Sequence, residues 1–146
     1  MDALNVLAGA VLTLIALLAW GGQTISWLAP DRAARWGLAE AEEDVEPTFW
    51  ADIRGEAAWD TVTLWTLVAA GVLLIVDQPA WAYFGLVGGG MYLYFAGRGI
   101  LTRIEMQRRG LRIGSPASVR TGMIALAVWG VTALVVIVAA VRALPT

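Results

Sequence analysis

Long apolar stretches separated by short charged segments make up most of this chain. Apolar runs of this length are typical of membrane-spanning helices, and they predict spans at about 4–28, 57–76, 81–98 and 119–141. The first run exceeds the apolar core of a secretory signal, roughly 7–15 residues, and no basic segment precedes it, so we interpret it as a retained helix. The pattern therefore predicts an all-α fold, an integral membrane four-helix bundle forming a single transmembrane domain over residues 1–146.

Three carboxyl groups precede the second span at a helical spacing. Asp52, Glu56 and Asp60 recur every four residues, so on a helix they share one face. We expect this helix to run unbroken from Pro47 to Val76, with Pro47 in its first turn. Only 16 uncharged residues follow Asp60. They give about 24 Å of helix against a bilayer core of about 30 Å. We therefore expect Asp60, and with it Glu56, to lie at or below the headgroup level.

The turn between the second and third spans brings an arginine to the same depth. The turn is only Asp77-Gln78-Pro79, so the two spans that it joins must be antiparallel neighbours. Asp60 lies 18 residues before Gln78 and Arg98 lies 20 after it. A carboxylate and a guanidinium at the membrane boundary should pair, because either alone is costly there. The expected ionic cluster contains Glu56, Asp60 and Arg98, with Asp52, Arg54 and Arg103 nearer the water. It is either a clamp that fixes the register of the hairpin or the rim of a polar cavity.

The first loop combines a short helix with an acidic run. Asp31–Leu38 contains a helix-capping aspartate, two arginines and apolar anchors, which predicts a short helix lying in the membrane interface. The run from Glu40 to Glu46 is interpreted as a solvated turn. A cation-binding loop is the alternative, although the run lacks the ligand spacing and turn glycine of a calcium loop. We expect no metal site.

Aromatic residues and glycines add two further hypotheses. Trp59 and Trp65 lie near the acidic stripe. With Tyr92 or Tyr94 of the third span they would form the walls of a site for a flat lipophilic ligand or a cation. Gly85 and Gly89 have the GxxxG spacing that lets helices approach closely in lipid. Close packing inside the bundle is the first interpretation of these glycines, and a dimer face is the second.

Composition removes several classes of function. The chain contains neither cysteine nor histidine, which excludes disulfides, thiol chemistry, and metal or acid–base sites that depend on imidazole. All ten basic residues are arginine, and the net charge of −2 favours no nucleic-acid partner. Nine of the ten arginines fall in the first and third loops and their flanks, and Arg142 alone lies on the opposite side. The positive-inside rule then predicts that both termini lie outside the cytoplasm. Because the absence of lysine is typical of a GC-rich bacterial genome, we expect the membrane to be a bacterial inner membrane.

Part of the sequence resembles the DoxX-like superfamily of small four-helix membrane proteins. The resemblance covers roughly the first half of the chain: Ala8-Gly9-Ala10 in the first span, Trp27-Leu28-Ala29-Pro30, Arg32–Leu38, and the polar Asp52–Glu56 opening the second span. The name-giving member is associated with quinone-linked sulfur oxidation, while most relatives have no assigned activity. This chain departs from the family pattern in its acidic loop and its arginine-rich third loop. The resemblance therefore implies the bundle and adds almost nothing on a reaction.

Three functions fit these features. The favoured one is a module that binds a lipid or a quinone-like molecule, or serves as an accessory subunit. The alternatives are a membrane enzyme that uses Glu56 or Asp60 on a lipophilic substrate, and an oligomeric ion or proton channel or transporter. The expected partners are membrane lipids, a lipophilic small molecule, and further copies or a membrane partner subunit, with no cofactor. The candidate ligand-binding residues are Asp52, Arg54, Glu56, Trp59, Asp60, Tyr94 and Arg98.

Overall fold

The computed structural model describes residues 2–144, and these residues are helical with no β-strand. The elements in chain order are α1 (Ala3–Leu28), α2 (Pro30–Arg35), the 3-10 helix η1 (Glu42–Asp44), α3 (Pro47–Thr63), α4 (Trp65–Ile75), α5 (Trp81–Arg108) and α6 (Pro116–Ala143). One isolated antiparallel bridge joins Val45 to Ile113 and ties the first loop to the loop between α5 and α6. The predicted all-α class is therefore confirmed.

Three helices are long and apolar enough to cross a membrane, which indicates a membrane protein. They are α1, the stretch Pro47–Ile75 that contains α3 and α4, and α6. The third predicted span, 81–98, forms the first part of α5, which is helical but is not among the three. Its many glycine, tyrosine and tryptophan residues are less apolar than the leucine and valine of the other helices. The four-span count thus stays a prediction.

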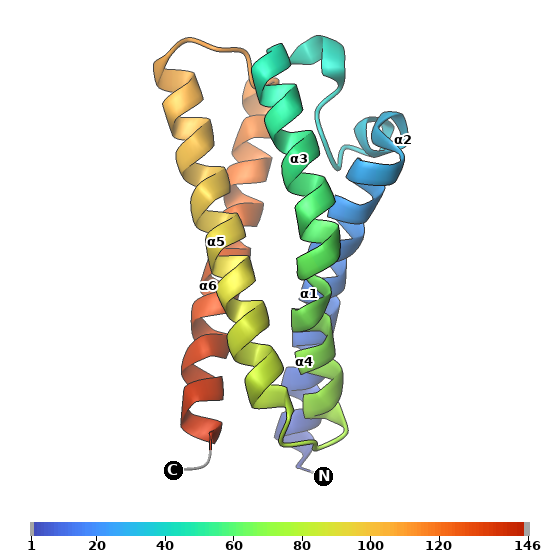
Figure 1. The fold of residues 1–146 in the computed structure, drawn as a ribbon, viewed down its shortest axis with the longest axis vertical. Helices are drawn as coiled ribbons and strands as arrows, with labels where there is room; N and C mark the ends of the chain where they lie inside the picture. Colours follow the sequence, from blue (N-terminus) through green and yellow to red (C-terminus); the bar gives the residue numbers. More distant parts are fainter. Residues whose placement is uncertain (1, 145–146) are drawn as a thin grey trace.

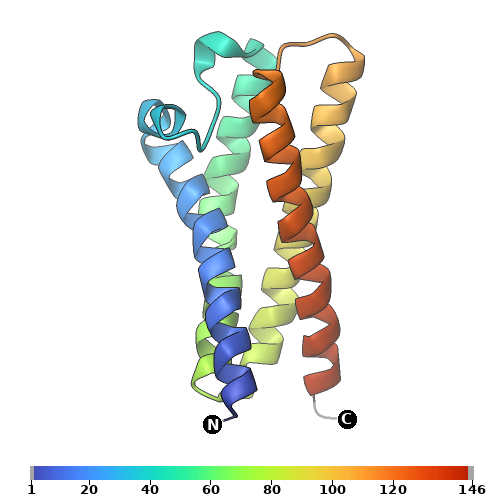
Figure 2. The same cartoon turned by 180° about the vertical axis from the view of Figure 1, so that it is seen from behind.

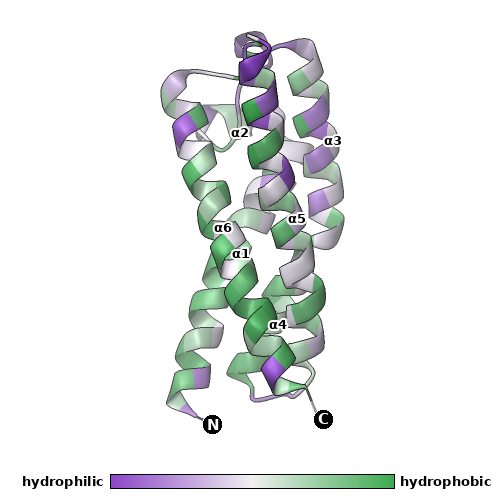
Figure 3. Ribbon diagram, turned by 90° about the vertical axis from the view of Figure 1, so that its left-hand side faces the viewer, coloured by the Kyte–Doolittle hydropathy of each residue, from purple (hydrophilic) through white to green (hydrophobic). Residues whose placement is uncertain are grey.

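The helices run lengthwise beside one another, with both termini at the same end (Figure 1). The turn between α4 and α5 lies at that end as well, and the reverse view shows the same arrangement (Figure 2). The opposite end carries α2, η1, the start of α3, the end of α5 and the start of α6. Most of the hydrophilic residues gather there (Figure 3), and we call it the polar end.

The helix after the acidic loop is interrupted once, at Leu64, so the prediction of an unbroken helix from Pro47 to Val76 is wrong at this residue. Side-chain donors take up three backbone carbonyls at the break: Trp20 donates to Thr61, Trp65 to Val62, and the Thr66 hydroxyl to Thr63. Threonine and tryptophan side chains that bond to nearby carbonyls compete with the helical ladder. The sequence Thr61-Val62-Thr63-Leu64-Trp65-Thr66 supplies several such donors together.

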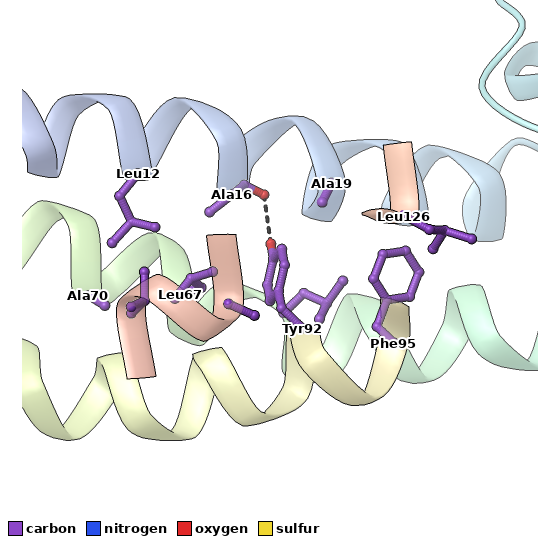
Figure 4. Close-up of a cluster of buried hydrophobic side chains, with 11 residues drawn as sticks. Leu12, Ala16, Ala19, Leu67, Ala70, Tyr92, Phe95 and Leu126 are labelled. Atoms are coloured by element: carbon purple, nitrogen blue, oxygen red, sulfur yellow. Dashed lines mark hydrogen bonds between the residues drawn. The ribbon is translucent and has the colours of Figure 1, made fainter. Parts of the chain in front are cut away.

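The largest core cluster is centred on Tyr92 of α5, which is fully buried (Figure 4). Its hydroxyl donates a 2.8 Å hydrogen bond to the carbonyl of Ala16 in α1, which satisfies the polar end of the ring in an apolar surrounding. Leu67 of α4 and Leu126 of α6 belong to the same cluster. The cluster therefore joins the helices of both halves of the chain.

Glycines of α5 allow its two neighbours to approach closely. A Cβ atom at Gly88 would lie 2.6 Å from the backbone nitrogen of Leu67 in α4. Gly85 and Gly89 face α6, where added Cβ atoms would lie 3.3 Å from Val136 and 2.7 Å from Ile137. The interpretation of Gly85 and Gly89 as packing positions inside the bundle is confirmed.

Candidate functional site

Arg98 of α5 clamps two carboxylates of α3. Its Nη1 donates a 2.8 Å hydrogen bond to Oε1 of Glu56, and its Nη2 donates to Oδ1 of Asp52. The Glu56 side chain is only 10% exposed, whereas Asp52 and Arg98 keep 26% and 30% of their side-chain surface. The predicted ion pair between Glu56 and Arg98 is confirmed. Asp52, expected nearer the water, is instead a direct partner of the guanidinium.

Asp60 lies one helical turn further from the polar end and takes no part in this clamp. The residue is 4% exposed, and its buried Oδ2 has no hydrogen-bond partner among the described residues 2–144. No ion pair joins it to Arg98 within that range, so the prediction of a direct Asp60–Arg98 contact is wrong. The two carboxylates that Arg98 does bind, Glu56 and Asp52, lie one and two helical turns before Asp60. The long arginine side chain extends toward the polar end, where its charge is better solvated.

Arg54 faces a different partner. Its guanidinium donates to the carbonyls of Ser26 and Trp27, the second at 2.8 Å, and lies 5.9 Å from the ring centre of Trp50. The last carbonyls of a helix have no partner within it and carry partial negative charge. Arg54 therefore caps the end of α1 and fixes α3 against it, outside the Arg98 clamp.

Trp59 and Tyr94 point outward from the bundle. Their exposed fractions are 58% and 63%, and neither side chain lines the internal cavity described next. Each is close in sequence to a buried residue, Asp60 or Tyr92, and one or two helical positions rotate a side chain by 100° or 200° at about 3.6 residues per turn. The structure thus brings neither Trp59 nor Tyr94 to the cavity. The other two candidates do not line it either, since Trp65 is 44% exposed and Tyr92 lies in the core.

A cavity of about 340 Å³ opens at the polar end between α1, α3, α5 and α6. Only apolar side chains line the part nearer the middle of the bundle. The part nearer the polar end is lined by polar side chains together with apolar ones such as Leu38, Trp50 and Ile53. The apolar lining includes Leu18, Ala19, Phe95, Ala125, Leu126 and Trp129, and the polar lining includes Gln23, Ser26, Glu40, Arg54, Glu56, Arg103, Ser118 and Thr121. Binding pockets of small molecules commonly have volumes of roughly 300–1,000 Å³ and combine an apolar wall with a few polar groups.

The helices α1 and α6 line opposite sides of this cavity. They contact one another at few points, whereas α1 packs along α4 and α6 packs along α5. Nearer the middle of the bundle the indole nitrogen of Trp129 in α6 donates to the carbonyl of Ile15 in α1 at 3.3 Å. The cavity therefore lies where the two halves of the bundle separate, on the polar side of that contact.

Arg103 and Glu40 are the two charged cavity residues that the sequence did not single out as ligand-binding candidates. Arg103 donates one hydrogen bond, from Nη1 to the carbonyl of Gly99 at 3.1 Å, and its guanidinium lies 5.5 Å from the ring centre of Phe49. Among the described residues it has no carboxylate within 4.0 Å. Most of its five N–H donors therefore remain for a guest in the cavity.

Glu40 turns into the cavity rather than into solvent, unlike the rest of the acidic run. Burial raises the pKa of the Glu40 carboxyl above its ordinary value of 4.5, while Ser118 and the charge of Arg103 oppose that rise. No sequence signal distinguishes Glu40 from Glu42 and Glu43, which are exposed. The path of the loop, held by the bridge between Val45 and Ile113, determines which of them faces inward.

The remaining acidic residues of the first loop make only peripheral contacts. Glu46 lies 3.7 Å from Arg112 at its carboxylate, and Arg112 also donates to the carbonyl of Glu43 at 3.4 Å. Within residues 2–144 no three acidic side chains come together as a group able to hold a metal ion. The loop is thus tied to the α5–α6 connection by an exposed ion pair and one backbone contact.

A scan of family models finds no match to this chain, and searches of curated proteins and of solved structures find none either. The resemblance to the DoxX-like superfamily accordingly stays a prediction from the residues quoted above. The function must therefore be inferred from the geometry of the cavity.

Proposed function

We propose that the chain crosses a bacterial inner membrane four times, with the polar end in the cytoplasm and both termini outside, in the manner of the DoxX-like bundles it resembles. Three apolar helices of sufficient length and the position of both termini at one end support this topology. Large apolar side chains on the outer surface also support it, because lipid can cover them. Those more than 60% exposed include Leu4, Leu7, Leu14, Val131 and Val135.

Within that topology, the protein binds a lipophilic molecule with a polar head group, of lipid or quinone-like chemistry. The observation that carries this proposal is the cavity, whose lining contains polar groups only toward the polar end and is apolar toward the middle of the bundle. A guest with a polar head and an apolar body matches that gradient along one direction. A wholly polar guest would leave Phe95, Leu126 and Trp129 without an apolar partner.

The charged lining suits a head group that accepts hydrogen bonds. Arg54 and Glu56 are already engaged, by the end of α1 and by Arg98. Arg103 has free donors and Glu40 lies beside it in the lining. Arg103 would bind a carbonyl, hydroxyl or phosphate oxygen of the guest, and the apolar body would extend between α1 and α6 toward lipid.

The enzyme alternative gains less support from this arrangement. A general base must reach the substrate and be free to accept a proton. Glu56 lines the cavity, but its Oε1 accepts a 2.8 Å hydrogen bond from Arg98 and is not free for a substrate. Asp60 does not line the cavity. Binding without catalysis is therefore the function that we favour.

Native mass spectrometry of the protein released from gentle detergent tests the proposal. We expect the wild type to carry a small lipophilic molecule, and the Arg103→Gln variant to lose most of it. Arg108→Gln is the matched control, because Arg108 lies on the same helix and is exposed. Equal occupancy in all three proteins would contradict the proposal. A symmetric oligomer without a bound molecule would instead favour the transporter alternative.

A further inference from the structure

Asp60 is a buried carboxyl group that does not line the cavity. It lies on α3 inside the second of the three candidate spans, and 96% of its surface is covered by the surrounding helices, since only 4% is exposed. Its Oδ2 has no hydrogen-bond donor within residues 2–144. A polar atom buried without a partner is rare in a folded protein and calls for an explanation.

The charged and titratable groups around Asp60 are already engaged with other partners. On its own helix, Asp52 and Glu56 bind Arg98 of α5. The hydroxyl of Tyr92, also from α5, donates a hydrogen bond to the carbonyl of Ala16. The helices α1 and α4 contain no titratable side chain, and the two arginines of α6, Arg120 and Arg142, lie near its ends. Within residues 2–144 no cation therefore forms an ion pair with Asp60.

An ionised carboxylate in that setting would be buried without compensation, and such a group takes up a proton instead. A metal ion would need several oxygen ligands, yet no three carboxylates come together as a metal-binding group among the described residues. We propose that Asp60 is a proton-binding site in the interior of the bundle, occupied at neutral pH. The proposal is independent of which molecule the cavity holds.

Glu56 provides the route by which this proton exchanges with water. It lies one turn from Asp60 toward the polar end and is the residue of the acidic stripe that lines the cavity. In the exchange step the O–H bond of Asp60 breaks and the proton forms an O–H bond with a carboxylate oxygen of Glu56. The negative charge moves to Asp60 while Glu56 becomes neutral, and Glu56 then releases the proton to water in the cavity. The pairing of Glu56 with Arg98 makes this step slow, because neutral Glu56 loses its attraction for the guanidinium.

Infrared spectroscopy of protein labelled with ¹³C at the aspartate carboxyls tests the assignment at neutral pH. We expect one protonated-carboxyl band in the wild type that is absent from Asp60→Asn and retained in Asp31→Asn, where the replaced carboxyl is exposed. Because asparagine is neutral and nearly isosteric with aspartic acid, the Asp60→Asn variant should fold. If it does not, the presence or absence of the band in the wild type still decides whether an aspartate is protonated. A wild type without the band at neutral pH would overturn the proposal.

The rate of hydrogen–deuterium exchange at Asp60, followed by the same infrared spectroscopy, tests the exchange route. After transfer into heavy water the Asp60 band shifts as deuterium replaces the proton. We expect Glu56→Gln to slow this shift at least tenfold, because the amide cannot carry the exchanging proton. Glu105→Gln, an exposed change on α5, should exchange at the wild-type rate. A wild-type rate in Glu56→Gln would refute the route while leaving the protonation of Asp60 to be judged by its band.

Discussion

Replacing Arg98 by methionine tests the clamp between α3 and α5. The change removes the guanidinium and keeps an apolar stem, so Asp52 and Glu56 lose their shared partner. Breaking a fully buried ion pair costs about 3–5 kcal/mol, and an exposed pair contributes about 0–1 kcal/mol. Glu56 is nearly buried, with 10% of its side chain exposed, while Asp52 and Arg98 are about a quarter to a third exposed. We therefore expect the free energy of unfolding to fall by about 2–3 kcal/mol, between those limits.

Reversible unfolding in mixed micelles, followed by tryptophan fluorescence, measures this loss. Arg109→Met is the matched control, because it breaks the exposed pair of Glu105 and Arg109 on the same helix and should change stability little. The double variant Glu56→Gln/Arg98→Met should recover part of the stability, since it removes the stranded charge together with its partner. An Arg98→Met variant as stable as Arg109→Met would refute the assignment of Arg98 as a clamp.

Two further predictions concern packing and pH. Gly88→Ala should lower the free energy of unfolding by about 1–3 kcal/mol, because its Cβ would lie 2.6 Å from the Leu67 backbone nitrogen, whereas Gly90→Ala has open space and should not destabilise. The same unfolding assay checks both, and equal effects would contradict the close approach of α4 and α5. Because burial raises the pKa of Glu40, its contribution to stability is complete below about pH 4.5 and is lost as pH rises through the raised value. Thermal midpoints across that window should therefore fall more steeply in the wild type than in Glu40→Gln, and parallel curves would show that Glu40 is solvated.

The sequence could predict the features that depend on local spacing. The four-residue recurrence of Asp52, Glu56 and Asp60 and the brevity of the Asp77–Pro79 turn were enough to place carboxylates of α3 against Arg98. The GxxxG spacing likewise indicated a close helix contact, because small side chains at one face have few other uses in an apolar helix. The position of a residue along its helix axis can thus be predicted from the sequence to within about one helical turn.

Rotation about each helix axis and the path of the loops could not be predicted in the same way. Both faces of α3 and α5 carry aromatic residues, so nothing in the pattern shows that Tyr92 is buried while Tyr94 is exposed. Arg54 finds its partners at the end of α1, 27 and 28 residues away, which depends on how α3 packs on α1. The inward direction of Glu40 depends on the bridge between Val45 and Ile113.

The central claim is that the cavity at the polar end holds a lipophilic molecule, and one matched pair of variants tests it most directly. Gly21 and Gly22 are neighbours in α1 with open space around both, but only Gly22 lines the cavity. A phenylalanine at Gly22 would fill the space for the guest, and one at Gly21 would leave it free. The measurement is the fraction of protein that retains a bound small molecule in native mass spectra. We expect Gly22→Phe to lose the molecule and Gly21→Phe to keep it at the wild-type level; equal retention by both variants would refute binding in this cavity.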